Sequence, residues 1–160
     1  MSAALLTPTT AERAAMRDVT DHACRLHDQG KDIVFTAAVV LDGKVVATAR
    51  NEVGETDDIS RHAEVVAIAA AARTLGRRDL HGATLIASCQ PCEMCLSAMR
   101  WAGIDRVIFA AQQANADAAF FRFPKLMIRD FHAACDGAFD WLGGLDEDRV
   151  AHIYAPGAAR

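Results

Sequence analysis

Positions 89–95 read Cys89-Gln90-Pro91-Cys92-Glu93-Met94-Cys95, and positions 61–64 read Arg61-His62-Ala63-Glu64. Pro91 disfavours a helical conformation at position 90 and favours a helix that starts directly after it. Cys92 and Cys95 would then lie three residues apart on one face of the first turn, where the helix N-terminus stabilises thiolates. We expect His62 and Glu64 to begin a second helix, so the fold should be organised around these two helix starts.

The residue types in the two stretches are those of a metal site. Zinc binds thiolate and imidazole groups, and a catalytic zinc has three protein ligands with water in the fourth position. We therefore predict His62, Cys92 and Cys95 as ligands of one zinc ion per chain, with Glu64 as an unbound carboxylate that transfers protons. Two alternatives stay open: Glu64 could serve only the helix dipole, and Cys89 could complete a closed, structural four-ligand site.

The two motifs together also carry a family resemblance. H-x-E followed by P-C-x-x-C is the signature of zinc-dependent base deaminases, and over roughly residues 33–121 the chain resembles the cytidine deaminase superfamily. Within it, the free-base branch with the guanine deaminases is most similar. The resemblance implies an α/β fold of three layers, α/β/α, with a mixed central sheet of about five strands flanked by helices, in a single domain spanning residues 1–160.

Local patterns predict the order of the elements. Thr9 and Glu12 have the spacing of a capping box that opens a helix, and Gly30 is a plausible stop for it. Asp42-Gly43 is a strong hairpin signal between two strands, and Ser60 is a suitable N-cap for the helix that carries His62. The expected strands are 33–41, 44–49, 83–88 and 106–111, with 149–154 as a fifth candidate. The expected helices are 61–75 and 92–102, a polar loop covers 52–60, and helical patterns recur at 116–121 and 125–134.

The resemblance also implies substrate contacts. Asn51 stands eleven residues before His62, where relatives have an Asn that hydrogen-bonds the substrate ring; the alternative is a turn-forming Asn at a strand end. Trp101 matches a Trp-Ala pair of guanine deaminases, where tRNA adenosine deaminases carry His-Ala, and it could stack on a purine or pack in the core. Asp117 could bind the N–H edge of guanine or cap a helix. We add Phe35 and Ala63 to the expected substrate contacts.

Two positions depart from the family pattern. Ile59 stands where relatives have Pro, which puts the shape of the loop before His62 in doubt. Gln90 replaces the Glu that most relatives carry before Pro-Cys, which removes a charge close to the site.

The expected reaction is hydrolytic deamination by zinc-activated water, with release of ammonia. Guanine is the first candidate substrate, and cytosine, an aminopyrimidine, a triazine or a pterin are others. The alternatives are a tRNA adenosine deaminase, a nucleoside deaminase and a non-catalytic zinc-binding module. A tRNA enzyme should have a basic rim, yet the net charge is −4 and the last fifteen residues contain Asp146, Glu147 and Asp148. Nucleic acid is therefore not the expected partner, whereas relatives lead us to expect a homodimer.

Composition bounds the remaining expectations. The 160 residues are 52% apolar, which fits one domain with a buried core and argues against disorder. No apolar run is long enough for a membrane span, and residues 1–6 lack the basic region of a signal peptide. The five cysteines are odd in number and two belong to the metal motif, which fits a reducing cytoplasm better than a disulfide scaffold.

Overall fold

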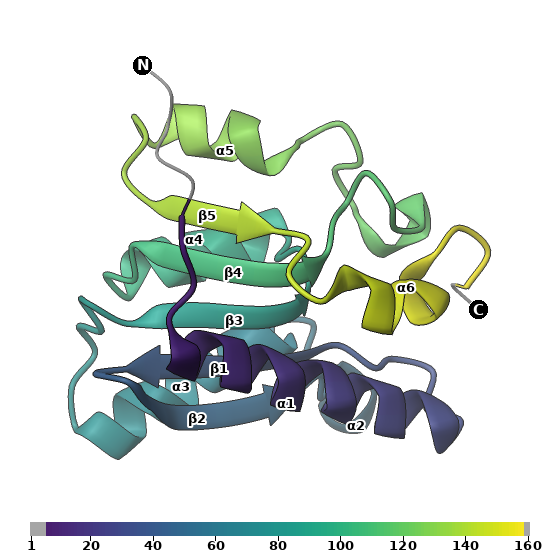
Figure 1. The fold of residues 1–160 in the computed structure, drawn as a ribbon, viewed down its shortest axis with the longest axis horizontal. Helices are drawn as coiled ribbons and strands as arrows, with labels where there is room; N and C mark the ends of the chain where they lie inside the picture. The colour runs from purple at the N-terminus through teal and green to yellow at the C-terminus, as the bar shows by residue number, and fades with distance from the viewer. Residues whose placement is uncertain (1–5, 159–160) are drawn as a thin grey trace.

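A five-stranded mixed sheet forms the centre of the protein (Figure 1). The computed structural model describes residues 6–158, so most of the N-terminal stretch considered for a signal peptide lies outside it. The strand order is β2-β1-β3-β4-β5; β1 is antiparallel to both β2 and β3, and β3, β4 and β5 are mutually parallel neighbours. The strands are β1 (Thr36–Leu41), β2 (Lys44–Arg50), β3 (Thr84–Cys89), β4 (Arg106–Ala111) and β5 (Asp140–Gly143).

Helices cover both faces of this sheet. In Figure 1, α1 (Thr10–Asp28) and α6 (Glu147–Tyr154) lie in front of it, and α3 (Ala63–Leu75) and α4 (Glu93–Trp101) lie behind. Successive residues of a strand point to opposite faces, and accordingly Ile86 and Ile108 belong to the core under α1, whereas Leu85 and Val107 belong to the core under α3 and α4. The predicted three-layer α/β/α architecture is confirmed.

Most predicted elements lie where the local patterns placed them. Thr9 and Glu12 form the capping box of α1, and Gly30 follows its C-terminus with a positive φ of 72°. Asp42 and Gly43 both have positive φ, as a two-residue hairpin turn between twisted strands requires. Strand β4 has the predicted bounds.

Four expectations need correction. The N-cap of α3 is His62, and Ser60 bonds Asp58 instead. The loop 52–60 contains a short helix, α2 (Val53–Thr56). The region after β4 contains the 3-10 helix η1 (Ala118–Phe120) and α5 (Ile128–Ala134), both shorter than expected. Residues 149–154 belong to helix α6, and β5 at Asp140–Gly143 is the fifth strand.

Helix α6 packs against the sheet of its own chain. Its buried residues Val150, Ile153 and Tyr154 follow helical spacing, which explains why this stretch is not a strand. The Tyr154 ring stacks on Phe35 with centroids 5.2 Å apart, and its hydroxyl lies 2.8 Å from Ser88 Oγ. This segment thus completes the core under α1. Among the described helices, none has the length and hydrophobicity needed to span a bilayer.

A buried carboxylate fastens α1 to the sheet. Glu12 accepts hydrogen bonds from the Thr9 N–H, the Thr84 hydroxyl and, through both oxygens, the Arg106 guanidinium. Burial alone would raise the pKa of Glu12, but the bonds from Arg106, Thr84 and Thr9 outweigh burial and lower its pKa to about 2.

This depressed pKa predicts how stability depends on pH. Because the pKa of Glu12 is about 4.5 in the unfolded chain and about 2 in the folded one, its contribution of about 3 kcal/mol is complete above pH 4.5 and is lost as the pH falls towards 2. Glu12→Gln should therefore lower the free energy of unfolding at pH 7 by a similar amount and flatten its decline between pH 4.5 and 2, measured by urea denaturation. The exposed Glu55→Gln, which also loses an arginine partner, is the control and should change little. Equal acid sensitivity of Glu12→Gln and the wild type would contradict this role.

Candidate active site

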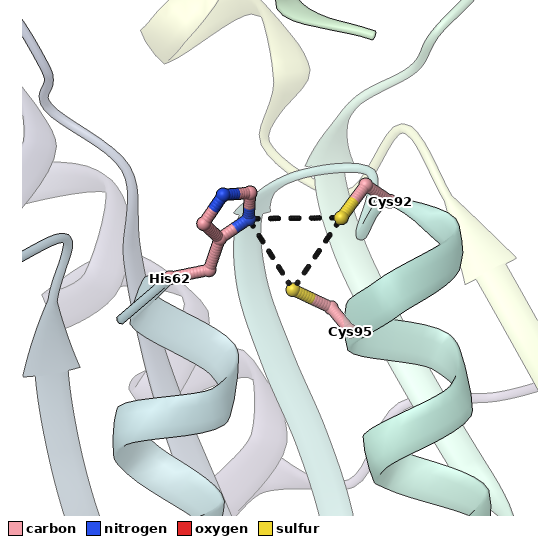
Figure 2. A group of neighbouring side chains, drawn as sticks. All are labelled: His62, Cys92 and Cys95. Carbon is pink, nitrogen blue, oxygen red and sulfur yellow. Dashed lines mark hydrogen bonds between the residues drawn. The ribbon is translucent and has the colours of Figure 1, made fainter. Parts of the chain in front are cut away.

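The sheet topology brings the two motif stretches together. Strands β2 and β3 are each antiparallel to β1 and therefore end at the same edge of the sheet. His62 lies beyond the end of β2 and is the N-cap of α3, and Cys92 lies beyond the end of β3 and is the N-cap of α4. Two helix starts thus face each other at this edge although they are thirty residues apart in sequence (Figure 2).

Three side chains at the N-termini of α3 and α4 form a compact triangle (Figure 2). His62 Nδ1 lies 3.6 Å from Cys92 Sγ and 3.6 Å from Cys95 Sγ, and the two sulfurs are 3.7 Å apart. Tetrahedral zinc with Zn–S bonds of about 2.3 Å and Zn–N bonds of about 2.0–2.1 Å requires about 3.8 Å between two sulfurs and about 3.6 Å between nitrogen and sulfur. The donor atoms therefore already have the spacing that tetrahedral zinc demands.

The protonation states of the two cysteines also suit a cation. The contact with Cys95 lowers the pKa of the Cys92 thiol to about 4, with further help from His62, so Cys92 is a thiolate at neutral pH. The same contact, together with burial, raises the pKa of Cys95. The hydrogen bond with Cys92 raises the pKa of His62. The sulfur pair thus shares one proton, which a bound cation would replace.

Cys89 does not complete a four-ligand site. Among residues 6–158, the one group of three or more candidate donors whose ligating atoms all lie within 4.8 Å of one another consists of His62, Cys92 and Cys95. Cys89 is buried at the end of β3, and this burial raises the pKa of its thiol, which keeps it protonated. Three protein ligands leave the fourth position for water or substrate, as in catalytic zinc sites.

Glu64 lies beside the triangle without belonging to it. Its side chain comes from the first turn of α3, and its Oε2 accepts a hydrogen bond of 3.4 Å from Cys95 Sγ. Burial raises the pKa of Glu64 to about 7, with a further contribution from the Cys92 thiolate. A carboxyl group with a pKa near neutrality can both accept and donate protons, the property required of a general acid–base.

A cleft of about 700 Å³ opens next to this group. His62, Glu64 and Cys92 line it together with Phe35 and Asn51. Asn51 Oδ1 accepts a hydrogen bond from the Val53 N–H at 3.0 Å, so Asn51 does form a local turn. Its side-chain NH₂ donates no hydrogen bond to any described residue and remains available to a ligand.

Aromatic side chains form one wall of the cleft. Phe35 meets Phe120 edge to face at 5.3 Å, and the buried Tyr154 ring supports both. Phe121 and Arg122 continue the wall. Local sequence patterns gave no signal for Arg122, because its place at the cleft depends on the packing of residues 112–124.

Three predicted substrate contacts lie outside this cleft. Trp101 is 92% exposed. It stands nine positions after Cys92, which is two and a half helical turns, so its side chain points away from the helix face that carries the ligands. Asp117 caps η1 by accepting a hydrogen bond from the Ala119 N–H, and it also accepts one from the Gly157 N–H. Of the two roles considered for Asp117, the structure therefore shows helix capping. Ala63 is fully buried in the core under α3.

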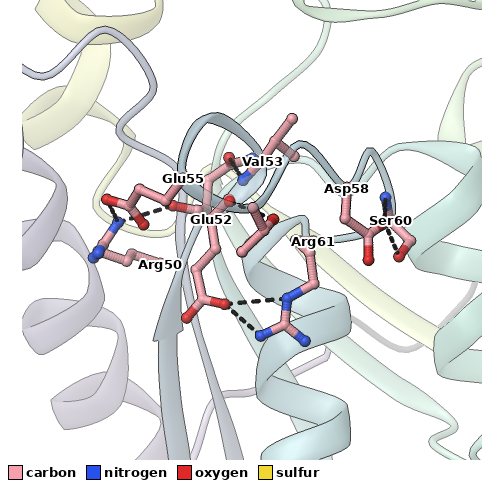
Figure 3. A network of polar contacts seen from close by, with 9 residues as sticks. Arg50, Glu52, Val53, Glu55, Asp58, Ser60 and Arg61 are labelled. Atoms are coloured by element: carbon pink, nitrogen blue, oxygen red, sulfur yellow. Dashed lines mark hydrogen bonds and ion pairs between the residues drawn. The ribbon is translucent and has the colours of Figure 1, made fainter.

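A polar network holds the loop that delivers His62 (Figure 3). The Glu52 N–H donates to the Arg61 carbonyl at 3.0 Å, and the Arg61 guanidinium pairs with the Glu52 carboxylate. Asp58 accepts from both the backbone and the hydroxyl of Ser60. Ile59, which replaces the usual Pro, is exposed. These contacts close the loop without the proline.

Comparisons with known proteins agree with this geometry. The family model for the cytidine and deoxycytidylate deaminase zinc-binding region matches residues 9–111. The tRNA-specific adenosine deaminase of Agrobacterium fabrum is 32% identical over 148 residues, 89% of this chain and 91% of that protein. The guanine deaminase of Bacillus subtilis is 39% identical over 99 residues, 62% of this chain and 64% of that protein, so the matched part spans less than two thirds of this relative.

Solved structures give the same two kinds of deaminase. A structure from a study of A-to-I editing by tRNA:A34 deaminases superimposes with a TM-score of 0.72 at 31% identity, covering 88% of this chain and 98% of that one. The X-ray structure of guanine deaminase from Bacillus subtilis gives a TM-score of 0.59 at 32% identity, covering 79% and 70%. The chain is thus similar to deaminases with two different kinds of substrate.

Proposed function

This chain belongs to the zinc-binding cytidine and deoxycytidylate deaminase family, and from that premise we propose that it hydrolytically deaminates a free nucleobase or a related amino-heterocycle, with guanine as the first candidate. One observation carries the proposal. Two members of the metal-binding triangle, His62 and Cys92, border one cleft together with the Glu64 carboxyl and the unpaired amide NH₂ of Asn51, and phenylalanines form its wall. A planar ring in that cleft can meet a cation, a proton carrier and a hydrogen-bond donor at once.

The chain's own residues supply the proton chemistry. His62, Cys92 and Cys95 would hold the zinc ion, which would supply Lewis-acid activation of water at neutral pH. Glu64 takes a proton from the attacking water and gives it to the ring nitrogen next to the attacked carbon. Glu64 then takes the proton of the hydroxyl group now on the ring carbon and transfers it to the exocyclic amine, so that the carbon–nitrogen bond breaks, ammonia leaves and a ring carbonyl remains.

The cleft fits a small flat substrate in size and lining. Its volume of about 700 Å³ lies within the range typical of small-molecule sites. The edge-to-face pair of Phe35 and Phe120 offers a rigid apolar surface against which a heterocycle can pack. Asn51 can donate to a ring nitrogen or carbonyl, which would orient the ring relative to Glu64.

A tRNA adenosine deaminase is the second candidate. Its support is the similarity to such an enzyme over 91% of that protein's length. The charges near the cleft support it less, because Arg122 is the one Arg or Lys among the described lining residues and Asp32 lies on the same cleft. A polynucleotide site needs several cations to neutralise phosphates.

Ammonia release from a substrate panel tests the proposal. The zinc-loaded protein should deaminate at least one free base or aminoheterocycle, among guanine, cytosine, aminopyrimidines, triazines and pterins, with kcat/KM at least tenfold above that for nucleosides and for tRNA. An enzyme that acts on tRNA with higher kcat/KM than on every free base would replace the first candidate by the second.

We also propose that the protein is a homodimer. Trp101 is a large side chain at 92% exposure, and tryptophan is enriched at protein–protein interfaces. Sedimentation equilibrium should give twice the monomer mass of 17.2 kDa, and a monomer at micromolar concentration would refute this.

A further inference from the structure

Two buried glutamines connect the metal-ligand loop to the cleft wall. Gln90 precedes Pro91 and is 7% exposed, and Gln113 follows β4 and is 8% exposed. Gln90 Nε2 donates to Gln113 Oε1 at 2.8 Å, and the Gln113 backbone N–H donates to Gln90 Oε1 at 3.3 Å. The two residues thus form a closed pair in which each contributes a donor and an acceptor.

The pair extends to the segment that forms the wall. Gln113 Nε2 donates to the Pro124 carbonyl at 3.3 Å, and the Gln90 N–H donates to the Ala111 carbonyl at 2.7 Å. Between Gln113 and Pro124 lie residues 119–122, each of which lines the cleft. A chain of hydrogen bonds therefore runs from the loop before Cys92, through two side-chain amides, to the far end of the wall segment.

Only an amide at both positions can satisfy this arrangement. Gln90 must donate to one oxygen and accept from one N–H, and Gln113 must accept from Gln90 while donating to Pro124. A carboxylate accepts but cannot donate, so an acid at position 90 would face Gln113 Oε1 with no proton between them. Because both side chains are largely buried, a donor or acceptor left unpaired here destabilises the folded protein.

We propose that Gln90 and Gln113 are positioning residues that hold residues 119–122 against the metal-ligand loop and so set the width of the substrate cleft. Breaking the pair frees the wall segment while the zinc ligands keep their places on α3 and α4. The effect on substrate binding rests on the proposed function, whereas the effect on the wall segment itself does not.

Hydrogen exchange of the zinc-loaded protein tests the physical part. Gln113→Met keeps the side-chain length but removes its hydrogen bonds, and peptides covering residues 114–127 should exchange at least tenfold faster, with zinc content unchanged. The milder Gln90→Met also breaks the pair but keeps the donation from Gln113 to Pro124, so it should give a smaller increase. Gln29→Met, the same change at an exposed glutamine outside the cleft, should leave exchange unaltered.

A double variant and kinetics complete the test. Gln90→Met combined with Gln113→Met should loosen the wall no more than Gln113→Met alone, because the two changes break the same pair.

On an identified substrate, Gln113→Met should raise KM about tenfold and change kcat by less than threefold. Unchanged exchange in residues 114–127, or an effect of equal size on KM and kcat, would overturn the proposal. If no panel substrate is deaminated, the proposed function fails while the exchange result still decides the role of the pair.

Discussion

Glu64→Gln should keep one zinc ion per chain and lower kcat by about 10³-fold, within the range of about 10²–10⁴ for loss of a general acid–base. The amide fills nearly the same space beside Cys95 but cannot accept a proton from water or pass one to the departing amine. Since Glu64 lies outside the group of ligating atoms, its loss should not release the metal. Zinc content by mass spectrometry and ammonia release by a coupled assay give the two readouts.

A neighbouring glutamate provides the control for this experiment. Glu93 lies in the first turn of α4, directly after Cys92, and does not line the cleft. Glu93→Gln should therefore retain both zinc and most of the activity. The role assigned to Glu64 would be wrong if Glu64→Gln lost zinc together with activity, or if it remained nearly as active as the wild type.

Cys92→Ala should release zinc and abolish activity, whereas Cys89→Ala, only three residues upstream, should retain zinc. Removing Cys92 takes one of three donors from the triangle and its thiolate charge with it, so zinc affinity should fall by at least about 100-fold, more than the 10–100-fold typical of losing a residue that only supports a ligand. Removing Cys89 deletes a buried protonated thiol from the core, with a packing cost and no loss of a donor.

Chelator competition measures this difference. Each variant is dialysed against a zinc chelator of known affinity, and bound zinc is then counted per chain. Equal zinc loss in both variants would mean that Cys89 is a ligand and that the site is closed, which would support the structural alternative.

The metal site was predictable because its parts are local. Pro91 determines where α4 starts, and the spacing of Cys92 and Cys95 places them on a common face. His62 is the N-cap of α3. Only one long-range fact was needed, namely that β2 and β3 end at the same edge of the sheet, and this follows from the hairpin at Asp42-Gly43 and the pairing of β1 with β3.

The rest of the cleft was less predictable because it depends on packing between distant segments. Phe35 and Asn51 line the cleft, but Trp101 points away from it because its helix phase is opposite to that of Cys92. In the C-terminal part, the apolar residues at 150, 153 and 154 have helical spacing, which the expectation of a strand over 149–154 did not take into account. These residues are buried against α1 and β4 as part of helix α6. The outermost strand next to β4 is instead β5, which has four residues.

X-ray absorption at the zinc edge of the zinc-loaded protein tests the central claim most directly. A site built from one imidazole, two thiolates and an open position predicts two sulfur neighbours at about 2.3 Å and two nitrogen or oxygen neighbours at about 2.0–2.1 Å. Three or four sulfur neighbours, or a shell made only of protein side chains, would contradict the account.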